Sequence, residues 1–174
     1  MKLTHAAVVA VASTIATLSS GAALAAADKS CDQGKYSAGD KMWLTGASEG
    51  DHFEIAAGRI ALERGNASVK ALGKRLLNDH TNALKEAEKV SRELKIPLKD
   101  KPSPSQEWIL TMLQKPGVDF DATFADLAVR DHHQDIEETQ EAADSGCSMA
   151  VRTLARNTLP ILKQHLEMAE KIKK

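Results

Sequence analysis

The chain is poor in several kinds of residue, and each shortage narrows what the protein can be. Only two of its 174 residues are cysteine, so it is not a disulfide-rich scaffold. Its 23 basic and 24 acidic residues nearly balance, and no basic excess indicates nucleic-acid binding. After the N-terminus, no segment approaches the ~20 consecutive apolar residues of a transmembrane helix. No transmembrane segment is therefore expected in the mature chain, and no pattern indicates a protein partner or an oligomeric state.

The first 25 residues have the pattern of a secretory signal peptide. Lys2 gives a basic start, residues 6–18 are mainly small and apolar, and Ala23-Leu24-Ala25 is a cleavage motif. Ala25-Ala26-Ala27 is a second one, so cleavage is expected after residue 25 or 27. A membrane anchor fits less well, because the stretch is short and rich in alanine. We therefore expect an exported protein.

Most of the chain after residue 47 has helical periodicity, and no segment shows the alternation typical of strands. Residues 26–47 lack this periodicity and are interpreted as a flexible N-terminal extension. The domain is expected over 48–174, with helices over 49–64, 67–95, 119–144 and 148–172 and a short helix beginning at Ser103-Pro104. Pro160 is expected to kink the last helix. Residues 69–74 resemble residues 151–156, so the pattern predicts an all-α four-helix bundle of two similar hairpins plus a short connecting helix.

Four ionisable residues lie on the apolar faces of these helices, one on each long helix. They are Glu54, His80, His132 and His165. Imidazole and carboxylate groups on facing bundle helices suit iron, zinc, copper or manganese, so these four are candidate metal ligands, with Asp79 and Asp131 as hydrogen-bond acceptors for their rings. Counting ~1.5 Å per residue from the turns places His132 and His165 roughly 7 Å apart in depth. One compact site and two looser pairs both remain open, as does a core of hydrogen-bonded histidines without metal.

No pattern indicates a catalytic site. The one Glu-x-x-His, at residues 49–52, lies where a helix is predicted to begin, so Glu49 and Asp51 are interpreted as capping charges. A phosphate-binding loop and a nucleophile elbow are both missing, so no enzyme activity is predicted. Cys31 and Cys147 are candidates for a disulfide between the extension and an inter-helix turn, and unpaired thiols or a bond between chains are the alternatives.

Several segments together resemble a widespread bacterial envelope family, the ferritin-like domain of unknown function numbered 4142, often labelled a predicted outer membrane protein. The segments are 54–61, Val69-Lys70, Asp79-His80-Thr81, Phe120-Asp121 with His132, and 159–166. The resemblance covers about residues 48–172. It implies a ferritin-like bundle and an exported location in the bacterial periplasm or outer envelope, and it supplies no activity. Glu54, His80, His132 and His165 fall on the family's motif positions. Two hypotheses follow: a metal-binding bundle, or a non-enzymatic envelope stress or structural protein with a hydrogen-bonded polar core.

Overall fold

The structure of the protein is a computed structural model, which describes residues 35–115, 117 and 119–173. The predicted signal peptide and residues 26–34 of the predicted extension, which include Cys31, lie outside the described residues. Within them the chain forms helices only, which are α1 (Ala38–Arg64), α2 (Ala67–Leu94), α3 (Pro104–Leu113), α4 (Phe120–Ser145) and α5 (Met149–Lys173). The all-α prediction is confirmed, as is the short helix at Ser103-Pro104.

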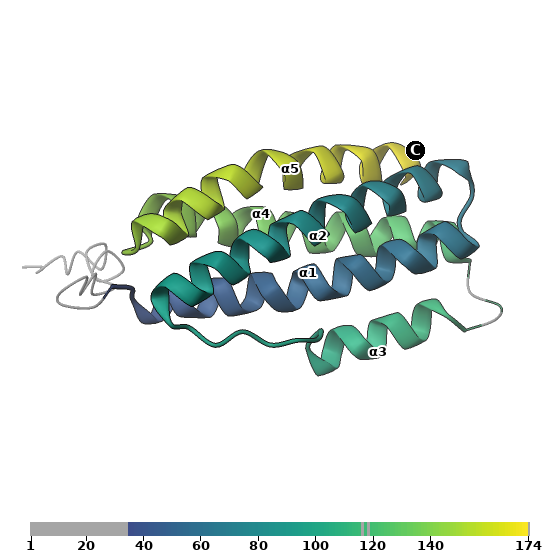
Figure 1. The fold of residues 1–174 in the computed structure, drawn as a ribbon. Helices are drawn as coiled ribbons and strands as arrows, with labels where there is room; N and C mark the ends of the chain where they lie inside the picture. Colours follow the sequence, from purple (N-terminus) through teal and green to yellow (C-terminus); the bar gives the residue numbers. More distant parts are fainter. Residues whose placement is uncertain (1–34, 116, 118, 174) are drawn as a thin grey trace, which may run out of the picture.

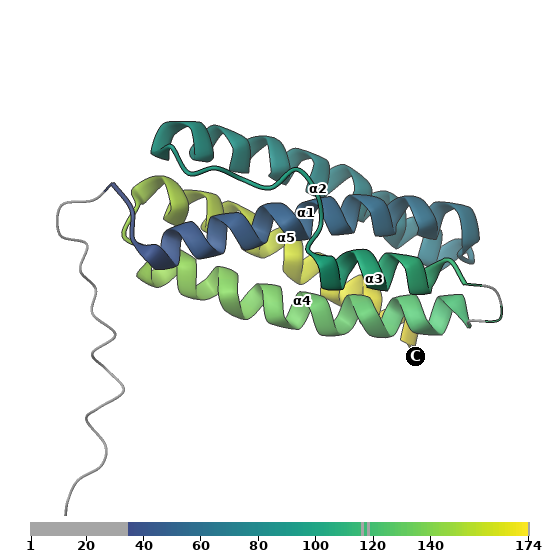
Figure 2. The same cartoon turned by 90° about the horizontal axis from the view of Figure 1, so that it is seen from below.

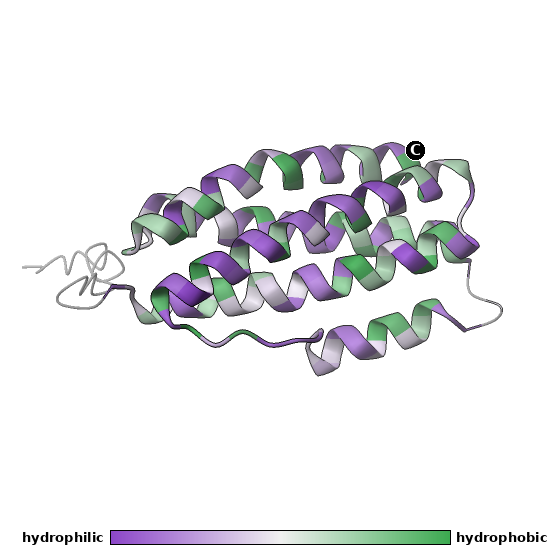
Figure 3. Ribbon diagram, in the orientation of Figure 1, coloured by the Kyte–Doolittle hydropathy of each residue, from purple (hydrophilic) through white to green (hydrophobic). Residues whose placement is uncertain are grey.

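The four long helices form a bundle of two hairpins (Figure 1). Helix α1 packs along α2, and α4 packs along α5. The link after α2 runs back along the bundle, so that α3 lies on the outside, against α1 and α4 (Figure 2). Polar residues colour the outer faces of the helices and apolar residues their inner faces (Figure 3). No helix among the described residues is long and apolar enough to cross a membrane.

Helix α1 begins at Ala38, well before the predicted start near residue 49, so that prediction is wrong. Ser37 caps the helix, and its side chain accepts a hydrogen bond from the backbone N–H of Asp40. The Asp40 carboxylate is buried and also accepts hydrogen bonds from the backbone N–H groups of Cys147 and Ser148. A buried carboxylate replaces the apolar residue that the helical pattern requires, which is why the periodicity is weak here.

Helices α1 and α2 approach closely at two glycines. A Cβ atom added to Gly58 would lie 2.6 Å from the carbonyl oxygen of Gly73, and one added to Gly73 would lie 2.5 Å from the Cβ of Ala61. Only glycine fits this contact, because real Cβ atoms do not approach other atoms so closely. The contact fixes the spacing of the first hairpin.

The apolar core consists of two clusters, one toward each end of the bundle. One cluster includes Leu72, Leu76 and Phe124, and the other includes Leu44, Val151 and Leu154. Along each long helix, buried polar residues lie between the stretches that supply the two clusters. The ionisable residues among them are Asp51, Glu54, His80, His132 and His165. The bundle therefore has a polar layer across its middle.

Candidate metal centre

Three of the predicted residues meet in this polar layer. His80 on α2 is 5% exposed, and His132 on α4 and His165 on α5 are fully buried. One ring nitrogen from each of the three lies within 4.8 Å of the other two. The distance between ring centroids is 5.2 Å for His132 and His165 and 5.3 Å for His80 and His165. This is one compact cluster rather than two separate pairs.

Each imidazole has an oxygen acceptor for one of its nitrogens. Nδ1 of His80 lies 2.8 Å from Oδ1 of Asp51, Nδ1 of His132 lies 2.9 Å from the carbonyl oxygen of Ala128, and Nε2 of His165 lies 2.9 Å from Oδ2 of Asp79. A carbonyl or an ionised carboxylate can only accept, so the ring nitrogen must donate in each contact. A neutral imidazole has a single N–H, and these three contacts use it in every ring.

The remaining nitrogen of each ring therefore carries a free lone pair. Nε2 of His80 is buried and has no hydrogen-bond partner among the described residues. Nε2 of His132 and Nδ1 of His165 lie 3.2 Å apart, and neither neutral ring has a proton left for that contact. Lone pairs that face each other repel, unless a cation lies between them. Ring nitrogens whose N–H groups are held by carboxylates or carbonyls are the usual form of histidine metal ligands.

Protonation of the rings is an unfavourable way to relieve this repulsion. Burial, together with the nearby His80 and His165, lowers the pKa of His132 from 6.5 to about 3. Burial likewise lowers the pKa of His165 from 6.5 to about 4, against the opposing effect of Asp79. At neutral pH both rings are uncharged, which is the state that binds a metal ion.

Glu54, the fourth predicted residue, lies beside this cluster. Oxygens of Glu54 and Asp131 and a ring nitrogen of His132 lie within 4.8 Å of one another. Burial and then repulsion from Asp131 raise the pKa of Glu54 well above its ordinary value of 4.5. Because His132 has only one free nitrogen, it can serve one ion at a time. The arrangement therefore suits a single ion held by the three rings, beside the carboxyl groups of Glu54 and Asp131, which approach His132.

The two residues predicted to support the rings take different positions. Asp79 accepts the hydrogen bond from His165 and also binds Arg75, whose Nη2 lies 3.0 Å from Oε1 of Gln164 on α5. Asp131 makes no hydrogen bond to a histidine ring within the described part of the chain. Its carboxyl group pairs with Glu54 instead, and burial raises its pKa.

Sequence reasoning missed Asp51, the acceptor for His80. It was interpreted as a capping charge, but α1 begins far upstream and Asp51 lies in the middle of the helix, 6% exposed. Burial raises its pKa, and the hydrogen bond from His80 opposes that shift. A usable signal was present, because Asp51 precedes Glu54 by three residues and Gly58 by seven, which places it on the same face of a continued helix.

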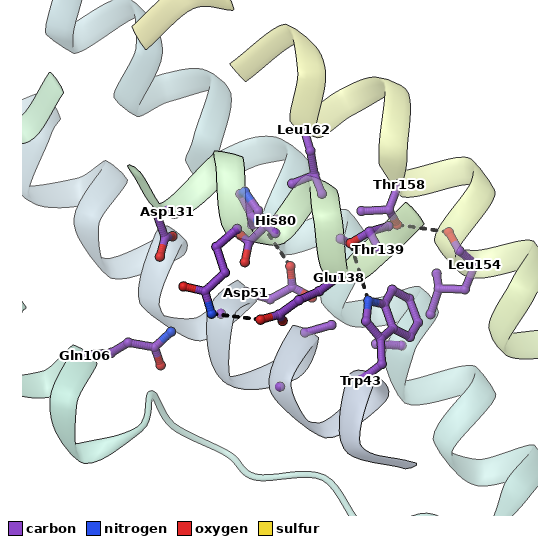
Figure 4. A pocket seen from close by; sticks show the side chains of 17 residues that line it. Trp43, Asp51, His80, Gln106, Asp131, Glu138, Thr139, Leu154, Thr158 and Leu162 are labelled. Carbon is purple, nitrogen blue, oxygen red and sulfur yellow. Dashed lines mark hydrogen bonds and ion pairs between the residues drawn. The ribbon is translucent and has the colours of Figure 1, made fainter. Parts of the chain in front are cut away.

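A cavity of about 190 Å³ opens onto this layer between α1 and α4 (Figure 4). The residues that line it include His80 and Asp51 and, along α4, Asp131, Asp135 and Glu138. Burial, followed by repulsion from Asp131, Glu138 and Asp51, raises the pKa of Asp135 well above its ordinary value of 3.8. The polar layer is thus reached through an acidic opening.

The predicted disulfide involves one residue at the end of the bundle. Cys147 lies in the turn between α4 and α5, and its thiol is not free. Cys31 lies outside the described residues, so pairing between the two stays a prediction.

Comparison with known proteins identifies a family. No curated protein and no solved structure matches the chain. One family matches over residues 25–172, nearly the whole of the chain beyond the predicted signal peptide, and it includes all four predicted ligands. The chain therefore belongs to the family described as domain of unknown function DUF4142.

Proposed function

We propose that this protein is an exported envelope protein that binds one transition-metal ion through His80, His132 and His165, with Glu54 as a further ligand. The observation that carries the proposal is the set of three free lone pairs in one buried cluster. Hydrogen bonding alone satisfies only the outer nitrogen of each ring. A cation would bind the three inner nitrogens together.

The donor atoms narrow the choice of metal. Neutral imidazole nitrogens with a carboxylate suit divalent iron, zinc, copper or manganese. Neither ligand group of the described residues contains a cysteine, so a site for soft thiolate-binding ions is disfavoured. Three neutral rings and one ionised carboxylate would leave a bound divalent ion with one uncompensated positive charge. Asp51 and Asp79 lie behind two of the rings and would offset that charge.

A structural role without metal is the second candidate, and one observation favours it. Within the described part of the chain, every buried side-chain nitrogen or oxygen atom except His80 Nε2 has a hydrogen-bond partner, as a polar core without metal requires. The polar layer could then act in envelope stress or in partner contacts and fix the register of the helices. Without a metal ion, however, no proton is available for the 3.2 Å contact between the ring nitrogens of His132 and His165. We therefore favour the metal site.

Glutamine substitutions test the proposal. We expect chelator-treated protein to gain thermal stability when Zn²⁺ or Fe²⁺ is added, because a ligand that binds only the folded state stabilises it. The variants H132Q and H165Q should lose that gain. The matched control is H133Q, since His133 neighbours His132 on α4 but is exposed and lies 4.0 Å from Glu170.

Folding of each variant is checked first by circular dichroism, and His80→Gln serves as a third variant if one of the others unfolds. A wild-type protein whose melting temperature does not respond to iron, zinc, copper or manganese would overturn the proposal. An unchanged response in folded H132Q and H165Q would also overturn it.

A further inference from the structure

We propose that the cavity between α1 and α4 is the route by which a divalent metal ion reaches the three-histidine centre, with Asp131, Asp135 and Glu138 as transient ligands along it. This inference rests on the proposed metal binding and adds how the ion enters. It concerns residues that the metal centre itself does not use, apart from Asp131.

The three carboxylates form a row along one face of α4. They are spaced by four and three residues, so the row spans about 10 Å of the helix. All three line the cavity, and Glu138 is exposed while Asp135 and Asp131 are half-buried. The row therefore leads from solvent to the residue that precedes His132. Carboxylate oxygens can replace water molecules around a divalent ion step by step along such a row.

One residue that lines the cavity has a ring nitrogen without a hydrogen-bond partner among the described residues. His80 lines the cavity and is 5% exposed, and its Nε2 atom makes no hydrogen bond. Figure 4 shows His80 and Asp51 joined by the contact between Nδ1 and Oδ1, with Glu138 close to them. An ion that moves along the carboxylates therefore arrives at a free imidazole lone pair.

The opposite face of the centre presents a positive charge. There, Asp79 is covered by the guanidinium group of Arg75, which also binds Gln164 on α5. A cation would have to displace this arginine in order to reach His165 from the α2–α5 side. The acidic cavity has no such barrier: none of the residues that line it is a lysine or an arginine.

The row is a route rather than a resting site. Within the described residues, the groups whose atoms lie close enough to hold an ion are the three histidines and the set of Glu54, Asp131 and His132. Asp135 and Glu138 belong to neither group. They should therefore change how fast an ion enters and leaves, with little effect on how tightly it is held.

The experiment measures the binding kinetics of Co²⁺, whose visible absorption reports binding directly. Chelator-treated wild type is mixed with Co²⁺ and compared with the double variant D135N/E138Q. The matched control is E137Q, since Glu137 is exposed on α4 but does not line the cavity. At low salt we expect D135N/E138Q to bind and release Co²⁺ about 5- to 10-fold more slowly, since charge along a path steers association. The dissociation constant should change less than 3-fold, and E137Q should behave as wild type.

Two results would overturn the proposal while metal binding stands. One is wild-type association and dissociation rates in D135N/E138Q. The other is a much weaker dissociation constant with an unchanged association rate, which would make Asp135 or Glu138 a ligand of the bound ion. A wild-type protein that binds no Co²⁺ would instead overturn the metal site and the route together.

Discussion

Nε2 of His132 and Nδ1 of His165 lie 3.2 Å apart in the middle of the bundle, although each ring donates its proton to an oxygen on its other side. The hydrogen bonds to Ala128 and Asp79 fix which nitrogen of each ring is free. The fold therefore holds two lone pairs toward each other, and His80 adds a third free nitrogen nearby.

The carboxylate behind His165 should set the affinity for metal. Asp79→Ala removes the acceptor for the His165 N–H, so the ring loses its fixed orientation and part of its basicity. We expect the affinity for Zn²⁺ to fall about 10- to 100-fold, and less in D79N, whose amide oxygen still accepts. Isothermal titration calorimetry measures both. The control is D126A, which removes an exposed aspartate that pairs with Lys173; equal affinities in D79A and D126A would contradict the role of Asp79.

Glu54 should lower the stability of the metal-free protein and raise its affinity for a metal ion. Burial and Asp131 raise the pKa of Glu54 in the folded metal-free protein, so that protein loses stability as the pH rises from 4.5, the ordinary value, toward the raised pKa. In chelator, Glu54→Gln should raise the free energy of unfolding by about 1–2 kcal/mol near neutral pH, and by less in acid. Its affinity for Zn²⁺ should fall at least about 10-fold.

Urea unfolding and calorimetry of E54Q give the two values, with E63Q as the control at an exposed position of α1. A less stable E54Q that keeps wild-type affinity would show that Glu54 is a structural residue and not a ligand.

The buried histidines should make the metal-free protein sensitive to acid. The pKa of His132 is lowered to about 3 and that of His165 to about 4, while the unfolded chain binds these protons near 6.5. Between these values the unfolded state holds more protons, so the stability that each neutral histidine confers is complete above about 6.5 and is lost as the pH falls. Each contributes a slope of about 1.4 kcal/mol per pH unit.

The raised pKa values of Glu54 and Asp135 change the stability in the opposite direction as the pH falls. Both groups are present in wild type and in H132Q, so the difference between the two plots of unfolding free energy against pH is due to His132. Urea unfolding in chelator from about pH 6.5 to 4 should give H132Q a shallower fall than wild type, by about the slope of one group. Parallel curves would mean that His132 is already protonated in the folded state.

The close contact of α1 and α2 should tolerate no side chain. Gly58→Ala places a Cβ atom 2.6 Å from the Gly73 carbonyl oxygen, so the helices must separate. We expect a loss of about 1–3 kcal/mol in the free energy of unfolding, despite the better helix propensity of alanine. Gly46→Ala is the matched control, because nothing lies within 4 Å of its added Cβ, and it should gain up to about 1 kcal/mol. A neutral G58A would show that the hairpin can adjust its spacing.

The helices that sequence predicted well have strong local signals. Asn66 caps α2 and Ser103 begins α3 with a capping box, and apolar residues follow each at helical spacing. The start of α1 has no such stripe, because Asp40 and Ser48 occupy buried positions there. Their burial depends on contacts with Cys147, Ser148 and Lys99, which no local pattern contains.

The sequence indicated which helix faces carry the residues of the candidate site, and it indicated their levels along the bundle less well. Placement on apolar faces found Glu54 and the three histidines, but residue counting left His132 and His165 about 7 Å apart in level. Their rings lie within contact distance, since a long side chain can lean along its helix by several ångströms. The pairing of Asp79 with His165 rather than with its neighbour His80 also depends on how the two hairpins dock.

Elemental analysis of the native protein tests the central claim most directly. The protein would be purified from a periplasmic extract without chelator, and its metal content measured against protein concentration. The metal centre predicts about one transition-metal ion per chain in the wild type and H133Q, and far less in folded H132Q. Protein that carries no iron, zinc, copper or manganese, and that takes up none when these ions are supplied, would contradict it.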